Sequence, residues 1–134
     1  MGHLKRINFA LIVLTTTLIS CLGNQDNFVK RQVTVDIYKS TIPTRGTINQ
    51  NIQIQLKAQA VNGCYSNIEI KIKEIDNRHF LLKATGLFQT NGICSDIMVY
   101  KDTIITFRPT LTGNYFFQIN EKPFEITKDT VEVN

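Results

Sequence analysis

Few residues in this chain have the types and spacing that catalysis requires. Two pairs of carboxylates, Glu69 with Glu74 and Asp96 with Asp102, are the nearest candidates for general acid and base work. All four lie among basic neighbours on expected strands or rims, as solvated strand charges do. The serines lack a histidine in a pattern that would activate them as nucleophiles. We therefore expect no enzymatic activity and no catalytic residue.

Histidine is too scarce for most metal chemistry. The chain holds two histidines, His3 near its start and His79. Catalytic zinc usually takes two or three histidines with a carboxylate or a cysteine, and blue copper takes two histidines and a cysteine. The sequence therefore predicts no metal site and no cofactor. We expect His79 to be a surface residue at the start of a strand.

The first of the three cysteines, Cys21, ends a short apolar segment. A basic start (Lys5 and Arg6) precedes an apolar run over residues 7–18, and Ile19 and Ser20 follow. About a dozen residues are too few for a membrane span, which needs about 20, but they fit a signal peptide. A small residue directly before the cysteine resembles the lipobox of bacterial lipoproteins. The resemblance implies cleavage before Cys21 and attachment of lipid to it. Plain secretion and a retained anchor are the alternatives.

The resemblance divides the chain into three parts. Residues 1–20 are then a lipoprotein signal peptide, residues 21–30 a lipidated N-terminus with a flexible tether, and residues 31–134 one domain. The nine residues that follow the cysteine reach about 30 Å at most. We therefore expect the domain close to a membrane of the bacterial cell envelope, which is the outer membrane if the host is Gram-negative.

The charge of the mature chain argues against nucleic acid as a partner. Removing residues 1–20 leaves 114 residues, with 13 basic against 11 acidic side chains, so the net charge falls from +4 to +2. No basic run is longer than Lys30 and Arg31, and no aromatic residues are interleaved with basic ones in the manner of a nucleic-acid surface.

Cys64 and Cys94 remain once Cys21 is assigned to lipid. Export places them where thiols oxidise, so we predict that they form a disulfide. Closing a loop of this length would stabilise the fold by roughly 3 to 4 kcal/mol. Two separate buried thiols are the alternative.

Apolar and polar residues alternate along most of the chain after the tether, which predicts that the cysteines and charged residues are positioned by β-strands. In residues 52–60, for example, every second residue is apolar and the residues between are Gln or Lys. The predicted strands are 32–38, 52–60, 68–73, 79–90, 97–107, 114–119 and 124–133. Asp102 and Thr103 interrupt the fifth, which leaves the count at seven or eight. We expect the second and third strands to be neighbours.

Seven short strands separated by turn residues favour an all-β, antiparallel sandwich. Within residues 107–117, the positions of Leu111, Gly113 and Tyr115 resemble the start of the penultimate strand in bacterial immunoglobulin-like and fibronectin-type domains. The resemblance implies an immunoglobulin-like β-sandwich with a tyrosine corner, in which the phenol of Tyr115 hydrogen-bonds back to the preceding backbone.

Strand direction brings the two loop cysteines together. In an up-and-down count, the loops after the second and fourth strands lie at one end, and they contain Cys64 and Cys94. Aromatic and amide residues on such braced loops suit recognition of a protein or a glycan. The candidate binding residues are Tyr65, Asn67, Ile93, Asp96 and Asn120. The alternative is that Tyr65 merely covers the disulfide.

The functional hypothesis is a membrane-anchored envelope lipoprotein that acts as a non-catalytic binding or structural module. The alternative is an inhibitor or accessory subunit of an envelope enzyme or transport complex.

The count of alternating strands also predicts how the domain is oriented. It places the tether at the disulfide end, which turns Tyr65, Ile93 and Asn120 toward the membrane. The residues left facing outward at the opposite end are Pro43, Arg45, Asn77, Arg78, Thr110 and Thr112.

Overall fold

The described part of the chain consists of β-strands joined by turns and loops. A computed structural model describes residues 28–122 and 125–134, so the predicted signal peptide and Cys21 lie outside the described residues. The strands are β1 (Val29–Thr41), β2 (Arg45–Gly46), β3 (Ile52–Ala60), β4 (Tyr65–Asp76), β5 (His79–Thr90), β6 (Val99–Phe107), β7 (Gly113–Lys122) and β8 (Glu125–Val133). The prediction of an all-β fold is confirmed, and each of the seven predicted strands corresponds to one of the seven long strands.

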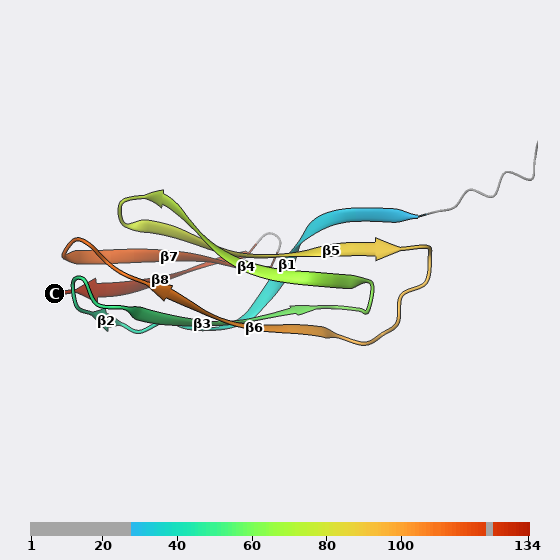
Figure 1. The fold of residues 1–134 in the computed structure, drawn as a ribbon, viewed down its shortest axis with the longest axis horizontal. Coiled ribbons are helices and arrows are strands. Elements are labelled where there is room, and N and C mark those ends of the chain that lie inside the picture. Colours follow the sequence, from blue (N-terminus) through green and yellow to red (C-terminus); the bar gives the residue numbers. More distant parts are fainter. Residues whose placement is uncertain (1–27, 123–124) are drawn as a thin grey trace, which may run out of the picture.

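The strands form one curled sheet with mixed pairing. Their order is β2-β8-β7-β5-β1-β3-β6, and β4 pairs with β5 outside this path. Most pairs are antiparallel, but β5 with β7 and β2 with β8 are parallel. In Figure 1, β3 and β6 lie along one side of the molecule, and β4, β5, β7 and β8 lie along the other. The sheet is therefore not wholly antiparallel, because the chain crosses between the sides after β6 and β7 then runs beside β5 in the same direction.

β1 joins the two sides of the sheet. Its residues 29–35 pair with β5, whereas residues 36–41 pair with β3. A register shift between Ile37 and Lys39 interrupts the pairing with β3, and such a bulge bends a strand. One long strand therefore contributes to both sides and encloses the core between them (Figure 1).

Alternate residues of the strands fill an apolar core. In β3 the side chains of Ile54, Leu56 and Ala58 are buried, while Gln53 and Gln55 on the other face of the strand are exposed. Aromatic rings pack at the centre, where Phe80 and Phe107 lie 4.8 Å apart and Phe107 and Phe117 lie 5.3 Å apart, measured between ring centroids. Burial of this apolar surface is the main force that holds the two sides together.

Tyr115 brings a hydroxyl group into this core. The residue is 1% exposed, and its hydroxyl accepts a hydrogen bond from the Leu111 N–H and donates one to the Leu111 carbonyl, both at 3.0 Å. The bonding of the phenol to the preceding backbone, which the resemblance implied, is thus present. It fixes the connection between β6 and β7 against the core.

Two expectations about individual strands are wrong. β3 and β4 are not paired, since β3 pairs with β1 and β6 while β4 pairs with β5. The loop between them crosses from one side of the molecule to the other. Asp102 and Thr103 do not interrupt β6, because their pairing with Lys57 and Leu56 is in continuous register. The eighth strand is instead the two-residue β2.

The first strand also begins before its predicted start at residue 32. Val29 and Lys30, which were expected in the tether, are the first residues of β1 and lie opposite Thr90 and Gln89 of β5. Pairing with β5 therefore extends the sheet into a segment that was expected to be tether.

Candidate functional site

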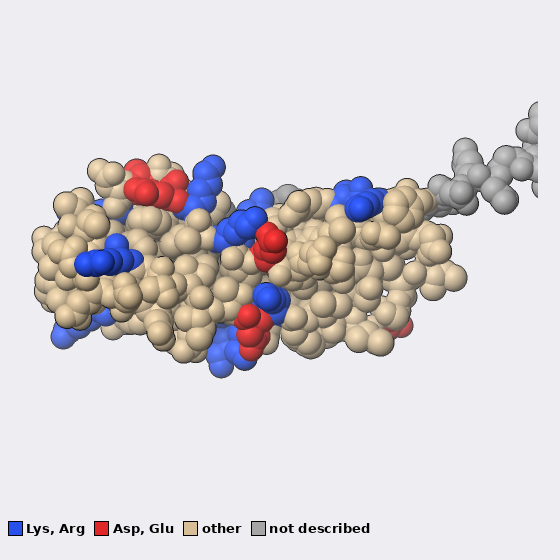
Figure 2. Space-filling model, viewed as in Figure 1, with Lys and Arg blue, Asp and Glu red and all other residues tan. Residues whose placement is uncertain are grey.

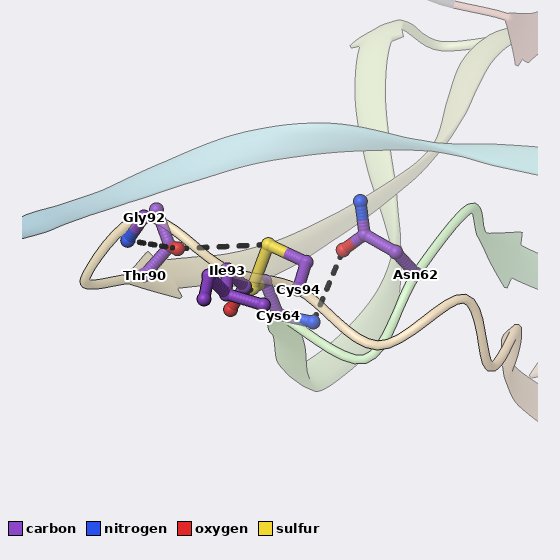
Figure 3. The surroundings of a disulfide bond; sticks show 6 residues. All are labelled: Asn62, Cys64, Thr90, Gly92, Ile93 and Cys94. Atoms are coloured by element: carbon purple, nitrogen blue, oxygen red, sulfur yellow. Dashed lines mark hydrogen bonds between the residues drawn. A yellow bond between two sulfur atoms is a disulfide. The ribbon is translucent and has the colours of Figure 1, made fainter.

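The predicted disulfide braces one end of the domain. Cys64 and Cys94 are bonded, with their Cα atoms 5.3 Å apart, and they join the β3–β4 loop to the β5–β6 loop. Figure 3 shows the bond lying between these two loops. The pairing of Cys64 with Cys94, and its location in loops at one end, are confirmed.

Backbone hydrogen bonds hold the same two loops around the disulfide. The Gly63 N–H donates to the Ser95 carbonyl, and the Gln89 N–H donates to the Cys64 carbonyl, both at 2.9 Å. The side chain of Asn62 accepts from the Cys64 N–H at 3.0 Å (Figure 3). The loops are therefore fixed by non-covalent contacts as well as by the covalent bond.

The braced end carries some of the candidate binding residues but not all of them. Ile93 and Asp96 are exposed there, and Asn67 is exposed in the irregular part of β4 with a φ of 48°. Tyr65 is half-buried, with its ring 5.1 Å from that of Phe88. Tyr65 therefore packs against the edge of the apolar core through Phe88.

Asn120 does not belong to this cluster. It lies in β7 opposite Ile126 of β8, and β7 meets β5 only at residues 79–82. The disulfide follows the other end of β5, so about 20 Å of strand separates the two, at about 3.3 Å per residue. The expectation failed because alternating strand directions predict which end a turn faces but not how far along its neighbours a strand extends.

A shallow hollow lies beside the disulfide. It has a volume of about 450 Å³ and is lined by Phe28, Thr90, Ile93 and Cys94 among others. Phe28 enters it from the residue before β1, and Ile93 enters it from the β5–β6 loop. This hollow at the braced end was not apparent in the sequence, because the two segments that bring Phe28 and Ile93 to it are far apart in the chain.

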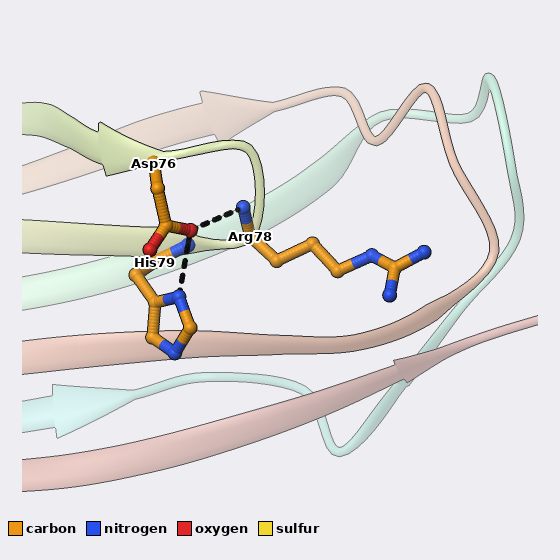
Figure 4. Close-up of polar contacts among 3 residues, drawn as sticks. All are labelled: Asp76, Arg78 and His79. Atoms are coloured by element: carbon orange, nitrogen blue, oxygen red, sulfur yellow. Dashed lines mark hydrogen bonds and ion pairs between the residues drawn. The ribbon is translucent and has the colours of Figure 1, made fainter.

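The β4–β5 turn organises the opposite end. The Asp76 carboxylate accepts hydrogen bonds from the backbone N–H groups of Arg78 and His79, each at 3.0 Å, and lies 2.6 Å from the His79 Nδ1 (Figure 4). The Arg78 N–H, and then the bond from His79, lower the pKa of Asp76 below its usual value of 3.8. Asp76 is thereby held in its charged form.

Arg78 extends from this turn toward the β6–β7 connection. Its guanidinium donates to the Thr112 carbonyl at 2.9 Å, and the Phe116 N–H donates to the Arg78 carbonyl at 2.8 Å. At the same end, the Glu132 N–H donates to the Thr44 carbonyl, and the Asn49 N–H donates to the Pro109 carbonyl. The segments that were expected to face outward therefore do gather at one end.

His79 lies on the outer face of the sheet, as expected for a surface strand residue. Its ring is stacked on that of Phe116, with centroids 4.8 Å apart and planes 11° apart. A second hollow of about 260 Å³ lies here, lined by His79, Phe80, Phe116, Gln118 and Lys128. Sequence reasoning missed it because it depends on the parallel pairing of β5 with β7, which the alternation does not reveal.

Two of the four carboxylates first considered for catalysis, Glu69 and Asp102, form surface ion pairs. Glu69 lies 2.6 Å from the Lys71 ammonium, which lowers the pKa of Glu69, and Asp102 lies 2.7 Å from the ammonium of Lys57. Within the residues that the structure describes, no three His, Cys, Asp or Glu side chains are grouped closely enough to hold a metal ion.

Neither similarity to known proteins nor a membrane-spanning helix helps to assign a role to these surfaces. Comparisons with protein-family models, curated proteins and solved structures find no match for this chain. Among residues 28–122 and 125–134, no helix is long and apolar enough to cross a membrane.

Proposed function

We propose that this chain is a lipid-anchored protein of the bacterial envelope and acts as a non-catalytic binding or structural module. The lipobox-like residues before Cys21 support a lipid on that cysteine. The observation that carries the proposal furthest is the place where β1 begins, since Val29 lies opposite Thr90, close to the disulfide. A tether that ends there holds the braced end near the membrane and leaves the other end free.

The free end is the surface on which we propose that a partner binds. It carries Arg45 on β2 and Arg78 on the β4–β5 turn, with the hollow over Phe116 nearby. Cationic and aromatic groups on a fixed turn suit a protein or a glycan that presents acidic groups. The hydrogen bonds of Asp76 and Arg78 hold this turn in one conformation, which lowers the entropy lost on binding.

The immunoglobulin-like or fibronectin-type relationship is part of the same proposal. The hydroxyl of Tyr115 bonded to Leu111 supports it, and so do the seven long strands that surround one core. The parallel pairs β5–β7 and β2–β8 are departures from a wholly antiparallel sandwich. Domains of this kind commonly bind through loops at one end of the strands.

The proposal is tested by placing a photo-crosslinking residue at Asn77 of the full-length chain in its host. Asn77 is exposed on the β4–β5 turn, and the same substitution at Ile93 serves as the matched control at the braced end. We expect a discrete crosslinked partner from position 77 but not from position 93, and Arg78→Ala should lower its yield. No crosslink from position 77 in membrane-bound protein would contradict a partner at the free end.

A further inference from the structure

We infer that apolar side chains at the disulfide end lie in the surface of the membrane that holds the anchor. The inference rests on the proposed lipid at Cys21. Six of the eleven exposed large apolar side chains in the described residues lie at this end. They are Phe28 (54% exposed), Val29 (41%), Val61 (61%), Ile93 (89%), Ile97 (70%) and Met98 (40%).

These side chains come from segments that the fold brings together. Phe28 and Val29 lie at the start of β1, beside the end of β5, and Phe28 shares a hollow with Ile93. Val61 follows β3 and Met98 precedes β6, at the end where Ala60 and Val99 are paired. The disulfide then ties the β3–β4 loop to the β5–β6 loop. The apolar residues therefore form one rim, the disulfide rim, defined by the six residues named above.

The charge around the disulfide rim suits an anionic lipid surface. In residues 28–31, 61–65 and 88–98, Lys30 and Arg31 are the basic residues, and Asp96 is the acidic one. Figure 2 shows that this end, on the right in the view, carries few charged side chains on the visible face, whereas Lys, Arg, Asp and Glu gather farther along the molecule. Apolar area flanked by basic residues is the combination that binds the interface of anionic membranes.

The anchor argues for the bilayer as the occupant. Cys21 and Phe28 are seven residues apart, so the chain between them spans about 25 Å at most. Such a short connection keeps the disulfide rim at a high effective concentration near the lipid, where even weak contacts are populated. A second copy anchored in the same membrane would turn its own rim toward that membrane, so the two rims would not cover each other.

A tryptophan placed on the rim can report this contact, because the chain contains no tryptophan of its own. The full-length lipidated Ile93→Trp variant is reconstituted in phosphatidylethanolamine–phosphatidylglycerol vesicles, with or without bromine atoms on the acyl chains, which quench tryptophan on contact. The matched control is Ile104→Trp, which replaces an isoleucine that is 60% exposed on the middle of β6. Ile97→Trp provides a second rim reporter.

We expect brominated lipid to lower the emission of the rim variants about twofold, since interfacial side chains enter roughly 5 to 10 Å into the bilayer boundary. The emission of the Ile104→Trp variant should be the same in both kinds of vesicle. Equal emission of Trp at 93 and at 97 in both vesicles, with lipid found on Cys21 by mass spectrometry, overturns the inference while the anchoring stands.

The absence of lipid on Cys21 would instead overturn the proposed anchoring. The unlipidated protein mixed with the same vesicles then tests the rim by itself. Quenching at position 93 under those conditions supports membrane contact without an anchor, and the lack of quenching overturns both proposals.

Discussion

Tyr115 and Asp76 illustrate how single polar groups shape this domain. Tyr115 is buried, and both hydrogen-bonding capacities of its hydroxyl are satisfied by one backbone residue, Leu111. Asp76 is exposed and receives hydrogen bonds from Arg78 and His79 within its own turn. Without the Tyr115 hydroxyl, the backbone groups of Leu111 would be left without a partner in the protein interior. Without the Asp76 carboxylate, the amides of Arg78 and His79 could hydrogen-bond to water instead.

Replacing Tyr115 with Phe should lower the free energy of unfolding by about 1 to 3 kcal/mol, because the Leu111 N–H and carbonyl lose their buried partner. Urea denaturation of the purified protein measures the change. The matched control is Tyr100→Phe, since Tyr100 is 58% exposed. An unchanged midpoint for Tyr115→Phe would show that the hydroxyl contributes nothing to stability.

The pKa of Asp76 predicts a local sensitivity to acid. Since its folded pKa lies below 3.8, the carboxylate contributes stability that is fully present above the unfolded value and is lost as the pH falls through the folded value. Titration of the Asp76 carboxyl carbon by NMR should therefore give a midpoint below 3.8. Asp76→Asn should remove the accompanying shift of the Arg78 amide. A midpoint at or above 3.8 would contradict this account.

Among the elements, alternation predicted the strands well but not their partners. Residues 52–60 alternate without exception and form β3 at the predicted bounds. Alternation reports which residues of a strand face the core, but it contains no information about which strand lies beside it. For this reason the expected pairing of β3 with β4 and the wholly antiparallel sheet were wrong. The division of β1 between β5 and β3 was not anticipated for the same reason.

At the candidate site, the disulfide could be predicted from the sequence, but the positions of Asn120 and His79 relative to other strands could not. Cys64 and Cys94 could be paired from the sequence, because the prediction that Cys21 carries lipid left each of the two with one possible partner. The place of Asn120 depended on how far β7 extends along β5, which turn residues do not encode. The stack of His79 on Phe116 required the parallel pairing of two strands and was equally inaccessible.

The disulfide between the β3–β4 loop and the β5–β6 loop should contribute much of the domain's free energy of unfolding. Cys64 and Cys94 are 30 residues apart, and the chain-entropy estimate gives roughly 3 to 4 kcal/mol for a loop of this length. The double variant Cys64→Ala, Cys94→Ala should lose about that much in urea denaturation. Reductant should destabilise the wild-type protein but not the variant. Equal stability of the two oxidised proteins would show that the hydrogen bonds around Gly63 and Gln89 suffice.

On the scale of the whole molecule, the two ends differ in character. The disulfide rim is apolar and lies where β1 begins, whereas the opposite end carries Arg45 on β2 and Arg78 on the β4–β5 turn. A short anchor at residue 21 would turn this difference into a fixed orientation, with the rim toward the membrane and the turns toward a partner.

This orientation predicts unequal access to a bulky thiol reagent. Single cysteines introduced by Arg45→Cys and Ile93→Cys, with the native disulfide intact, should differ in labelling rate on membrane-bound protein. After division by the rates in detergent, position 45 should label faster, because the membrane shields position 93. Equal normalised rates would show that the domain has no preferred orientation on the membrane.

The lipid on Cys21 is the claim on which the functional account depends most. Its direct measurement is metabolic labelling of host cells with an alkyne analogue of palmitate, followed by mass spectrometry of the N-terminal peptide. The account predicts label on a mature chain that begins at Cys21, and Cys21→Ser should abolish both the label and the removal of residues 1–20. A chain that is exported and cleaved elsewhere without label would contradict the account.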